Sequence, residues 1–189
     1  DMLGTPRLQN MFELLGCEEP LGVFYAEKAP TDSLTPPPDR GHACIINYLR
    51  MAFDRKICVH FAADACTCMG GWVYLGYRLP APERIVHFVT TGWEGGEGER
   101  YLPSPDSMRR FFRDIDVQPA PAPFCAARPL SQFAEGEEPL LVTFRCRGEA
   151  LTGLSMLAGF ALDDHNAVVM PFGSGCANIF AWPLNWRRR

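Results

Sequence analysis

The stretch Val117-Gln118-Pro119-Ala120-Pro121-Ala122-Pro123 decides how the chain is organised. Alternating prolines favour an extended, semi-rigid polyproline conformation, so this stretch is predicted to be a linker. It divides the chain into two halves, and each half mixes strand-like and helix-like patterns without a strict repeat. We therefore expect residues 1–189 to form a single domain of the α+β class, with a mixed β-sheet and flanking helices, and not a doubly wound α/β fold.

Capping signals and apolar periodicity predict the elements on either side of the linker. Thr5-Pro6 and Ser104-Pro105 each combine a capping hydroxyl with a proline at the first helical position, and apolar residues follow at helical spacing. Runs rich in β-branched and aromatic residues predict strands. The expected helices are 6–15, 43–53, 72–77, 82–90, 105–115 and 148–158; the expected strands are 21–27, 56–62, 124–128, 140–146 and 167–171; 29–41 and 92–98 are expected to be loops.

Composition excludes several classes of function. With 47% hydrophobic residues, 21% charged residues and a net charge of -4, the chain is an ordinary globular sequence with no sign of a nucleic-acid or membrane partner. The sequence contains no signal-peptide pattern and no apolar run long enough to span a membrane, so we expect a cytoplasmic protein. Its eight cysteines are too few for a disulfide scaffold and are expected to be reduced thiols. No Walker loop, dinucleotide fingerprint or G-x-S-x-G elbow occurs.

Three cysteines occupy special backbone positions. Cys44 opens a predicted helix, Cys68 precedes a glycine pair, and Cys176 ends a Gly-Ser-Gly-Cys turn. Amides and the positive dipole end of a helix start stabilise a thiolate, and glycines let the backbone approach a ligand closely. We therefore predict that the three thiols are metal ligands, and that neighbouring residues line the cofactor: Gly70, Gly71, Gly173, Ser174 and Gly175.

The remaining cysteines and histidines carry weaker signals. Cys66 could join Cys68 on one metal or be a bystander, since a C-x-C pair occurs in many kinds of turn. His42 could be a fourth ligand or an acid/base partner, although a loop histidine is more often simply solvated. The other cysteines are interpreted as core packing because of their apolar or strand-like surroundings: Cys17, Cys58, Cys125 and Cys146.

The chain resembles an uncharacterised prokaryotic family known as domain of unknown function 169. Similar proteins have cysteines at the positions of Cys44, Cys68 and Cys176, but usually another residue at the position of Cys66. They also continue past the position of Pro183 with a further strand-rich segment, whereas this chain ends at Arg189. The resemblance rests on four segments in the same order: CIINYLRMA at 44–52, CMGG with YLGY at 68–77, GERY at 98–101, and 167–176.

Three hypotheses follow for the function. The first is that Cys44, Cys68 and Cys176 hold an iron–sulfur cluster, or alternatively zinc, with Cys66 or an exogenous ligand at the fourth position and a redox or sensor role. The second is a thiol enzyme that uses Cys176 as nucleophile. The third is a non-enzymatic domain that binds a small molecule or a partner. The expected partners are an unknown small molecule or redox protein, and a homo-oligomer is possible.

Overall fold

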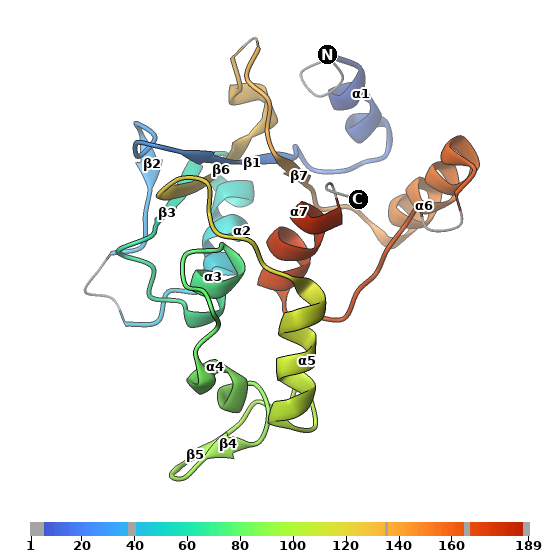
Figure 1. Ribbon diagram of the computed structural model, residues 1–189. Coiled ribbons are helices and arrows are strands. Elements are labelled where there is room, and N and C mark those ends of the chain that lie inside the picture. Colours follow the sequence, from blue (N-terminus) through green and yellow to red (C-terminus); the bar gives the residue numbers. More distant parts are fainter. Residues whose placement is uncertain (1–5, 38–40, 135, 165–166, 187–189) are drawn as a thin grey trace.

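The computed structural model describes residues 6–37, 41–134, 136–164 and 167–186 (Figure 1). Its main sheet has five strands in the order β2-β3-β6-β1-β7. The pair β2–β3 is parallel, and the other pairs are antiparallel, so the sheet is mixed. Helices flank it, which confirms the expected α+β class. The strands are β1 (Leu21–Ala26), β2 (Ser33–Leu34), β3 (Cys58–Ala62), β6 (Phe124–Pro129) and β7 (Leu141–Thr143).

Most predicted helices form, with shifted ends. A π-helical turn (Ala177–Ala181) continues directly into α7 (Trp182–Trp186), a segment for which no element was predicted from the sequence. The strand expected at 167–171 does not form among the described residues of that range. The other helices are α1 (Pro6–Leu14), α2 (Ile45–Arg55), α3 (Met69–Tyr74), α4 (Glu83–Phe88), α5 (Pro105–Ile115), α6 (Gly148–Leu162) and a 3-10 turn (Leu130–Gln132).

The glycine-rich stretch at 92–98 forms a small hairpin instead of the expected loop. Its strands are β4 (Gly92–Trp93) and β5 (Gly96–Glu97), which pair antiparallel. Gly95 lies in the turn with φ of 84°. Glycine at a positive φ is typical of tight hairpin turns. The glycines at 92–98, which led us to expect a loop, therefore also allow the tight turn of the hairpin.

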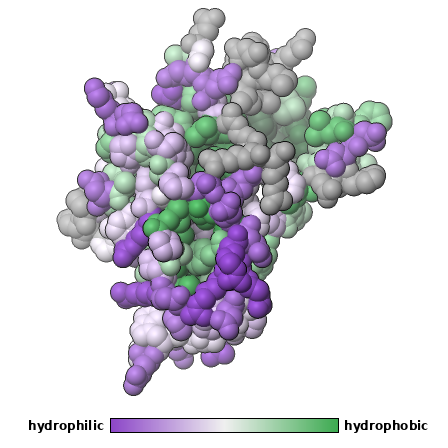
Figure 2. All heavy atoms as spheres, viewed as in Figure 1, coloured by the Kyte–Doolittle hydropathy of each residue, from purple (hydrophilic) through white to green (hydrophobic). Residues whose placement is uncertain are grey.

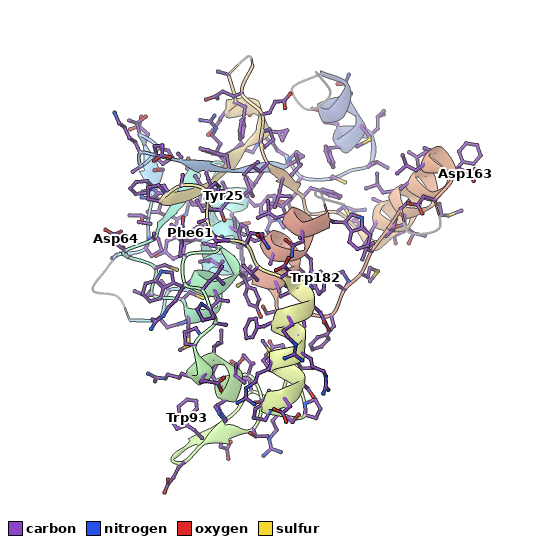
Figure 3. The ribbon with its side chains drawn as sticks, in the orientation of Figure 1. Tyr25, Phe61, Asp64, Trp93, Asp163 and Trp182 are labelled. Atoms are coloured by element: carbon purple, nitrogen blue, oxygen red, sulfur yellow. The ribbon has the colours of Figure 1, made fainter. Side chains whose placement is uncertain are left out.

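The core lies where α2 packs on β3 and β6. Tyr48 of α2 meets Phe61 of β3 in an edge-to-face contact with 6.2 Å between ring centroids, and Phe61 and Tyr25 both point into the centre of the molecule (Figure 3). The sequence pattern predicted that β3 buries one face, but all five of its residues are buried. The second face is closed because His60 bonds the Ser33 hydroxyl at 2.7 Å and packs edge-on against Phe124.

The proline-rich linker is packed against the first half of the chain. The amide of Ala120 donates to the carbonyl of Gly76 at 3.0 Å, just beyond the end of α3. Gly76 has φ of 79°, and a Cβ built there would lie 2.3 Å from the backbone oxygen of Gln118. The strand that follows the linker, β6, pairs with β3 and β1 from the first half. The two halves therefore contribute to the same sheet.

Helix α6 differs from the other helices in its surroundings. It projects from the rest of the chain (Figure 1) and none of its residues is buried, although its sequence is apolar. Met156 and Phe160 are 72% and 88% exposed. Within the described ranges, no helix combines the length and apolarity needed to cross a membrane.

Replacing Gly76 by alanine should destabilise the protein more than replacing Gly95. Both glycines have a positive φ, so each alanine costs about 1–2 kcal/mol in backbone strain. The Gly95 methyl meets nothing within 4 Å, whereas the Gly76 methyl runs into the linker backbone, which adds about 1–3 kcal/mol. Urea unfolding followed by circular dichroism measures the difference. Equal losses at the two positions would show that the linker does not pack against α3.

Candidate functional site

Three cysteines from separate segments lie at the starts of three helices. Cys44 is the N-cap of α2, Cys68 is the N-cap of α3, and Cys176 lies at the start of the π-helical turn. A hydrogen bond joins the side chains of Cys68 and Cys176, and Cys44 is near enough to raise the pKa of Cys176. The fold therefore brings together the three residues that the sequence singled out.

Two glycines make this convergence sterically possible. A Cβ at Gly71 would lie 2.9 Å from Cγ2 of Ile45, and a Cβ at Gly175 would lie 3.3 Å from the side chain of Ile46. Real side chains avoid such distances, so any larger residue would push α3 or the 173–176 turn away from α2. Ile45 and Ile46 directly follow Cys44, so both segments that carry the other two thiols pack against the same first turn of α2.

The sulfur of Cys68 is surrounded by hydrogen-bond donors. The hydrogen bond with Cys176 lowers its pKa most, followed by bonds from the backbone amides of Gly71 and Ile45, and the nearby His42 adds to the effect. The Gly71 amide lies 3.3 Å from the sulfur. Together these contacts lower the pKa of Cys68 well below the ordinary value of a thiol, despite its burial. The same pairing raises the pKa of Cys176, which is the thiol that donates.

The two sulfurs form the floor of a pocket of about 440 Å³. Figure 2 shows green, apolar residues gathered in a hollow bordered by hydrophilic ones on the lower part of the molecule. Tyr74 stands beside the sulfurs, where its side chain bonds that of Ser174. Most of the remaining lining is apolar and aromatic, as in many small-molecule sites. These apolar and aromatic residues are Ile85, Phe88, Val89, Trp93, Tyr101, Leu102, Met108, Phe111 and Phe172.

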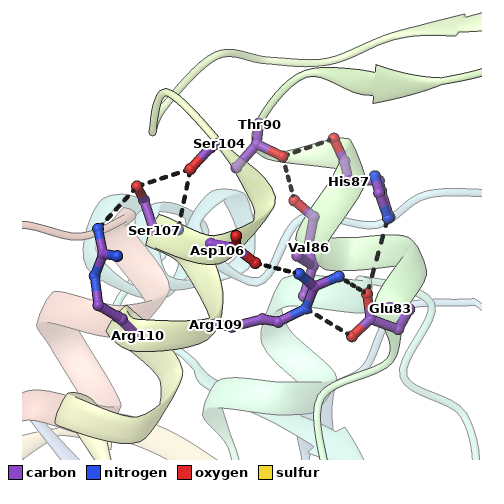
Figure 4. Close-up of polar contacts among 9 residues, drawn as sticks. All are labelled: Glu83, Val86, His87, Thr90, Ser104, Asp106, Ser107, Arg109 and Arg110. Carbon is purple, nitrogen blue, oxygen red and sulfur yellow. Dashed lines mark hydrogen bonds and ion pairs between the residues drawn. The ribbon is translucent and has the colours of Figure 1, made fainter.

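A polar network holds the wall of the pocket in place (Figure 4). Arg109 of α5 donates two hydrogen bonds to the Glu83 carboxylate of α4, at 3.1 and 2.7 Å, and a third to Asp106 at 2.6 Å. The Arg109 guanidinium holds the pKa of Glu83 below its ordinary value. At the other end of α4, the buried Thr90 hydroxyl donates to the Val86 carbonyl at 2.6 Å. Of these contacts, the Arg109–Glu83 pair joins α5 to α4 beside the pocket.

The other predicted site residues fall into two groups. Gly70, Gly173, Ser174 and His42 line the pocket with the two sulfurs. Cys44, Gly71, Gly175 and Cys66 do not line it. The Cys66 thiol contacts the Cys68 carbonyl at 3.6 Å and lies near Tyr77 and Cys125. In the part of the chain that the structure describes, no group of three or more Cys, His, Asp or Glu side chains is close enough to hold a single metal ion.

The cysteines interpreted as core packing differ among themselves. All eight cysteines are free thiols. Cys125 and Cys58 are buried, as expected, and burial raises the pKa of both thiols. Cys17 and Cys146 are only half-buried, and their side chains bond each other. They meet because the amide of Glu18 donates to the carbonyl of Arg145 at 3.1 Å, so the residues next to Cys17 and Cys146 are joined by a backbone hydrogen bond.

Sequence reasoning missed the pocket itself. Its aromatic lining comes from α4, the hairpin, α5 and the segment before Gly173, which are scattered along the chain. The contact between Tyr74 and Ser174 also went unnoticed, although Tyr74 belongs to the YLGY segment that carries the family resemblance. No local pattern could have shown that the Ile45 amide points at the Cys68 sulfur.

The fold and site together define an α+β domain with a cysteine site that opens on an apolar pocket. A family model matches residues 11–188, and the chain belongs to that family, domain of unknown function 169, whose description is "Uncharacterised ArCR". No curated protein and no solved structure matched the chain. The family membership agrees with the resemblance seen in the sequence.

Alkylation of metal-free protein should distinguish Cys68 from the other thiols. The thiolate is the reacting form, and the lowered pKa of Cys68 keeps more of it ionised at a given pH than an ordinary thiol. Its reaction rate with iodoacetamide should therefore rise much less than that of an ordinary thiol between about pH 6.5 and 8.5. The pKa of Cys17 is raised by burial and by Cys146, so its rate should climb about tenfold per pH unit over this range. Peptide mass spectrometry measures both rates, and a Cys68 rate that climbs like that of Cys17 would contradict the assignment.

Proposed function

We propose that this protein binds an iron–sulfur cluster through Cys44, Cys68 and Cys176, with one coordination position open to the pocket. The observation that carries the proposal is the convergence of three helix starts that carry Cys44, Cys68 and Cys176, two of which, Cys68 and Cys176, line one cavity. Thiolates are the usual protein ligands of such clusters. Three protein ligands would leave a position for a small molecule that enters from the pocket.

The surroundings of the thiols support a bound anionic centre. Backbone amides of Gly71 and Ile45 point at the Cys68 sulfur, and hydrogen bonds to cluster sulfurs are one way in which proteins tune such centres. The close approach of Gly71 and Gly175 to α2 brings the three helix starts next to one another. Burial of Cys68 and Cys176 would shield a cluster from water.

A cluster and a single zinc ion need different arrangements of the thiols. Zinc needs its ligands gathered tightly in a tetrahedron, and the described residues contain no such compact group. Thiolates on different irons of a cluster lie about 6–7 Å apart. Cys68 and Cys176 would have to separate from hydrogen-bond contact to reach that spacing. The turn before Cys176 contains two glycines, which gives the chain the freedom for such a shift.

Cys66 is a poor choice for the fourth ligand. Its sulfur is directed toward the core, where it is close to Cys125 and Tyr77. The fourth position is therefore proposed to face the pocket and to take an exogenous ligand.

A thiol enzyme is the second candidate, and one observation favours it. Cys68 accepts hydrogen bonds from two amides and from the Cys176 thiol, which is how a protein prepares a nucleophilic sulfur. The same contacts make Cys68, and not Cys176, the candidate nucleophile. Two results together would favour this candidate. Wild-type protein would contain no metal and react with a thiol-directed substrate, and Cys68→Ser would lose all of that reaction.

Iron and acid-labile sulfide should be measured in protein purified without oxygen. The proposal predicts similar amounts of both, about four of each per chain for a [4Fe–4S] centre. Cys44→Ser, Cys68→Ser and Cys176→Ser should each lose most of the iron, because serine is a poor ligand for iron in such clusters.

Two matched controls accompany this measurement. Cys146→Ser alters a half-buried thiol paired with Cys17, and Cys66→Ser alters a thiol beside Cys68 that does not line the pocket. Both should keep the wild-type iron content. Freshly purified wild-type protein without iron and sulfide would refute the cluster, and loss in Cys66→Ser would make Cys66 the fourth ligand.

A further inference from the structure

The aromatic side chains around the pocket point to a ligand class. Four of them are large, apolar and yet solvent-exposed: Phe88 is 36% exposed, Trp93 43%, Tyr101 52% and Phe172 56%. Exposed aromatic residues gathered around one cavity mark a binding site more often than scattered ones do. Trp93 projects from the hairpin at the lower edge of the molecule (Figure 3), so the hairpin contributes directly to this rim.

The rings form two pairs from different parts of the chain. Phe88 and Trp93, from α4 and β4, have centroids 6.4 Å apart, and Arg84 lies over the Trp93 ring at 5.6 Å. Phe111 and Phe172, from α5 and the segment before Gly173, meet edge-to-face at 6.2 Å. Further rings prefer offset or edge-on contacts of this kind, with centroids about 4.5–7 Å apart. A planar aromatic ligand would extend both pairs.

The charges around the pocket favour an uncharged ligand. Arg84 and Glu99 both line it and are exposed, so the rim carries one charge of each sign. The helix-start amides that could bind an anion already donate to the Cys68 sulfur. The other polar side chains of the lining are uncharged, apart from His42 and the two sulfurs: Tyr74, Tyr101 and Ser174 carry hydroxyls, and most of the remaining surface is apolar.

We propose that the pocket binds an uncharged aromatic small molecule, with its rings among Phe88, Trp93, Phe111 and Phe172 and one end at the Cys68 and Cys176 sulfurs. The volume of about 440 Å³ lies in the usual range for small-molecule sites and suits a ligand of about two or three rings. This inference rests on the proposed function for the role of the sulfur floor. Binding of the rings depends on the aromatic walls and not on a bound metal.

Gly70 offers a way to fill the pocket without disturbing the fold. It lines the pocket, and a Cβ there would meet only Tyr74, at an ordinary 3.9 Å. Gly70→Leu should therefore occupy the space of the ligand. Gly153→Leu on α6 is the matched control, since it also adds a leucine to a helix, at a position with nothing within 4 Å.

The test uses N-phenyl-1-naphthylamine, an uncharged aromatic probe that fluoresces in apolar surroundings. Wild-type protein and Gly153→Leu should bind it with the same affinity, and naphthalene should displace it while inorganic phosphate should not. Gly70→Leu should bind the probe at least about tenfold more weakly. Trp93→Ala should also weaken binding. If Gly70→Leu binds the probe as tightly as wild type, the probe is elsewhere and the inference fails.

The outcome can be separated from that of the proposed function. Iron and sulfide are measured in the same wild-type preparation, and the probe is also titrated into Cys176→Ser. Probe binding that Gly70→Leu abolishes, in protein without iron, would refute the cluster and keep the aromatic ligand. If the wild-type protein contains iron and sulfide but Gly70→Leu leaves probe binding unchanged, the cluster is supported and the aromatic ligand is refuted.

Discussion

The packing of three helix starts around the first turn of α2 is the constraint on which the candidate site depends. Ile45 and Ile46 occupy that turn, directly after Cys44, and the two glycine-bearing segments press against them. Without the approach at Gly71 and at Gly175, Cys68 and Cys176 could not reach each other. The same packing aims the Ile45 amide at the Cys68 sulfur. Steric fit and thiolate stabilisation therefore have a common origin.

The rest of the fold holds this arrangement from two sides. The sheet supports α2 through β3 and β6, which are linked by the chain that passes Gly76 and the proline-rich linker. On the other side, the Glu83–Arg109 contacts join α4 to α5, and both helices contribute aromatic residues to the pocket. The pocket therefore lies between the packed core and the pair of helices α4 and α5.

The sequence was informative where the signals are local. Caps, prolines and glycines act on their immediate neighbours in the sequence, so the α+β class, most helices and the position of Cys44 at a helix start could be predicted. The pocket could not, because its lining comes from segments whose proximity depends on the tertiary fold. Local signals also failed where packing outweighed them: α7 includes Pro183, and His60 is buried by contacts with Ser33 and Phe124. Whether the three thiols bind iron remains a proposal that rests on their convergence.

A crystal structure of protein purified and crystallised without oxygen, with anomalous diffraction recorded at the iron absorption edge, tests the central claim most directly. The account predicts iron peaks among Cys44, Cys68 and Cys176, with one iron facing the cavity lined by Phe111 and Phe172. It also predicts that the Cys68 and Cys176 sulfurs are farther apart than hydrogen-bond contact. Ordered sulfurs without an iron peak, or iron bound by other residues, would contradict it.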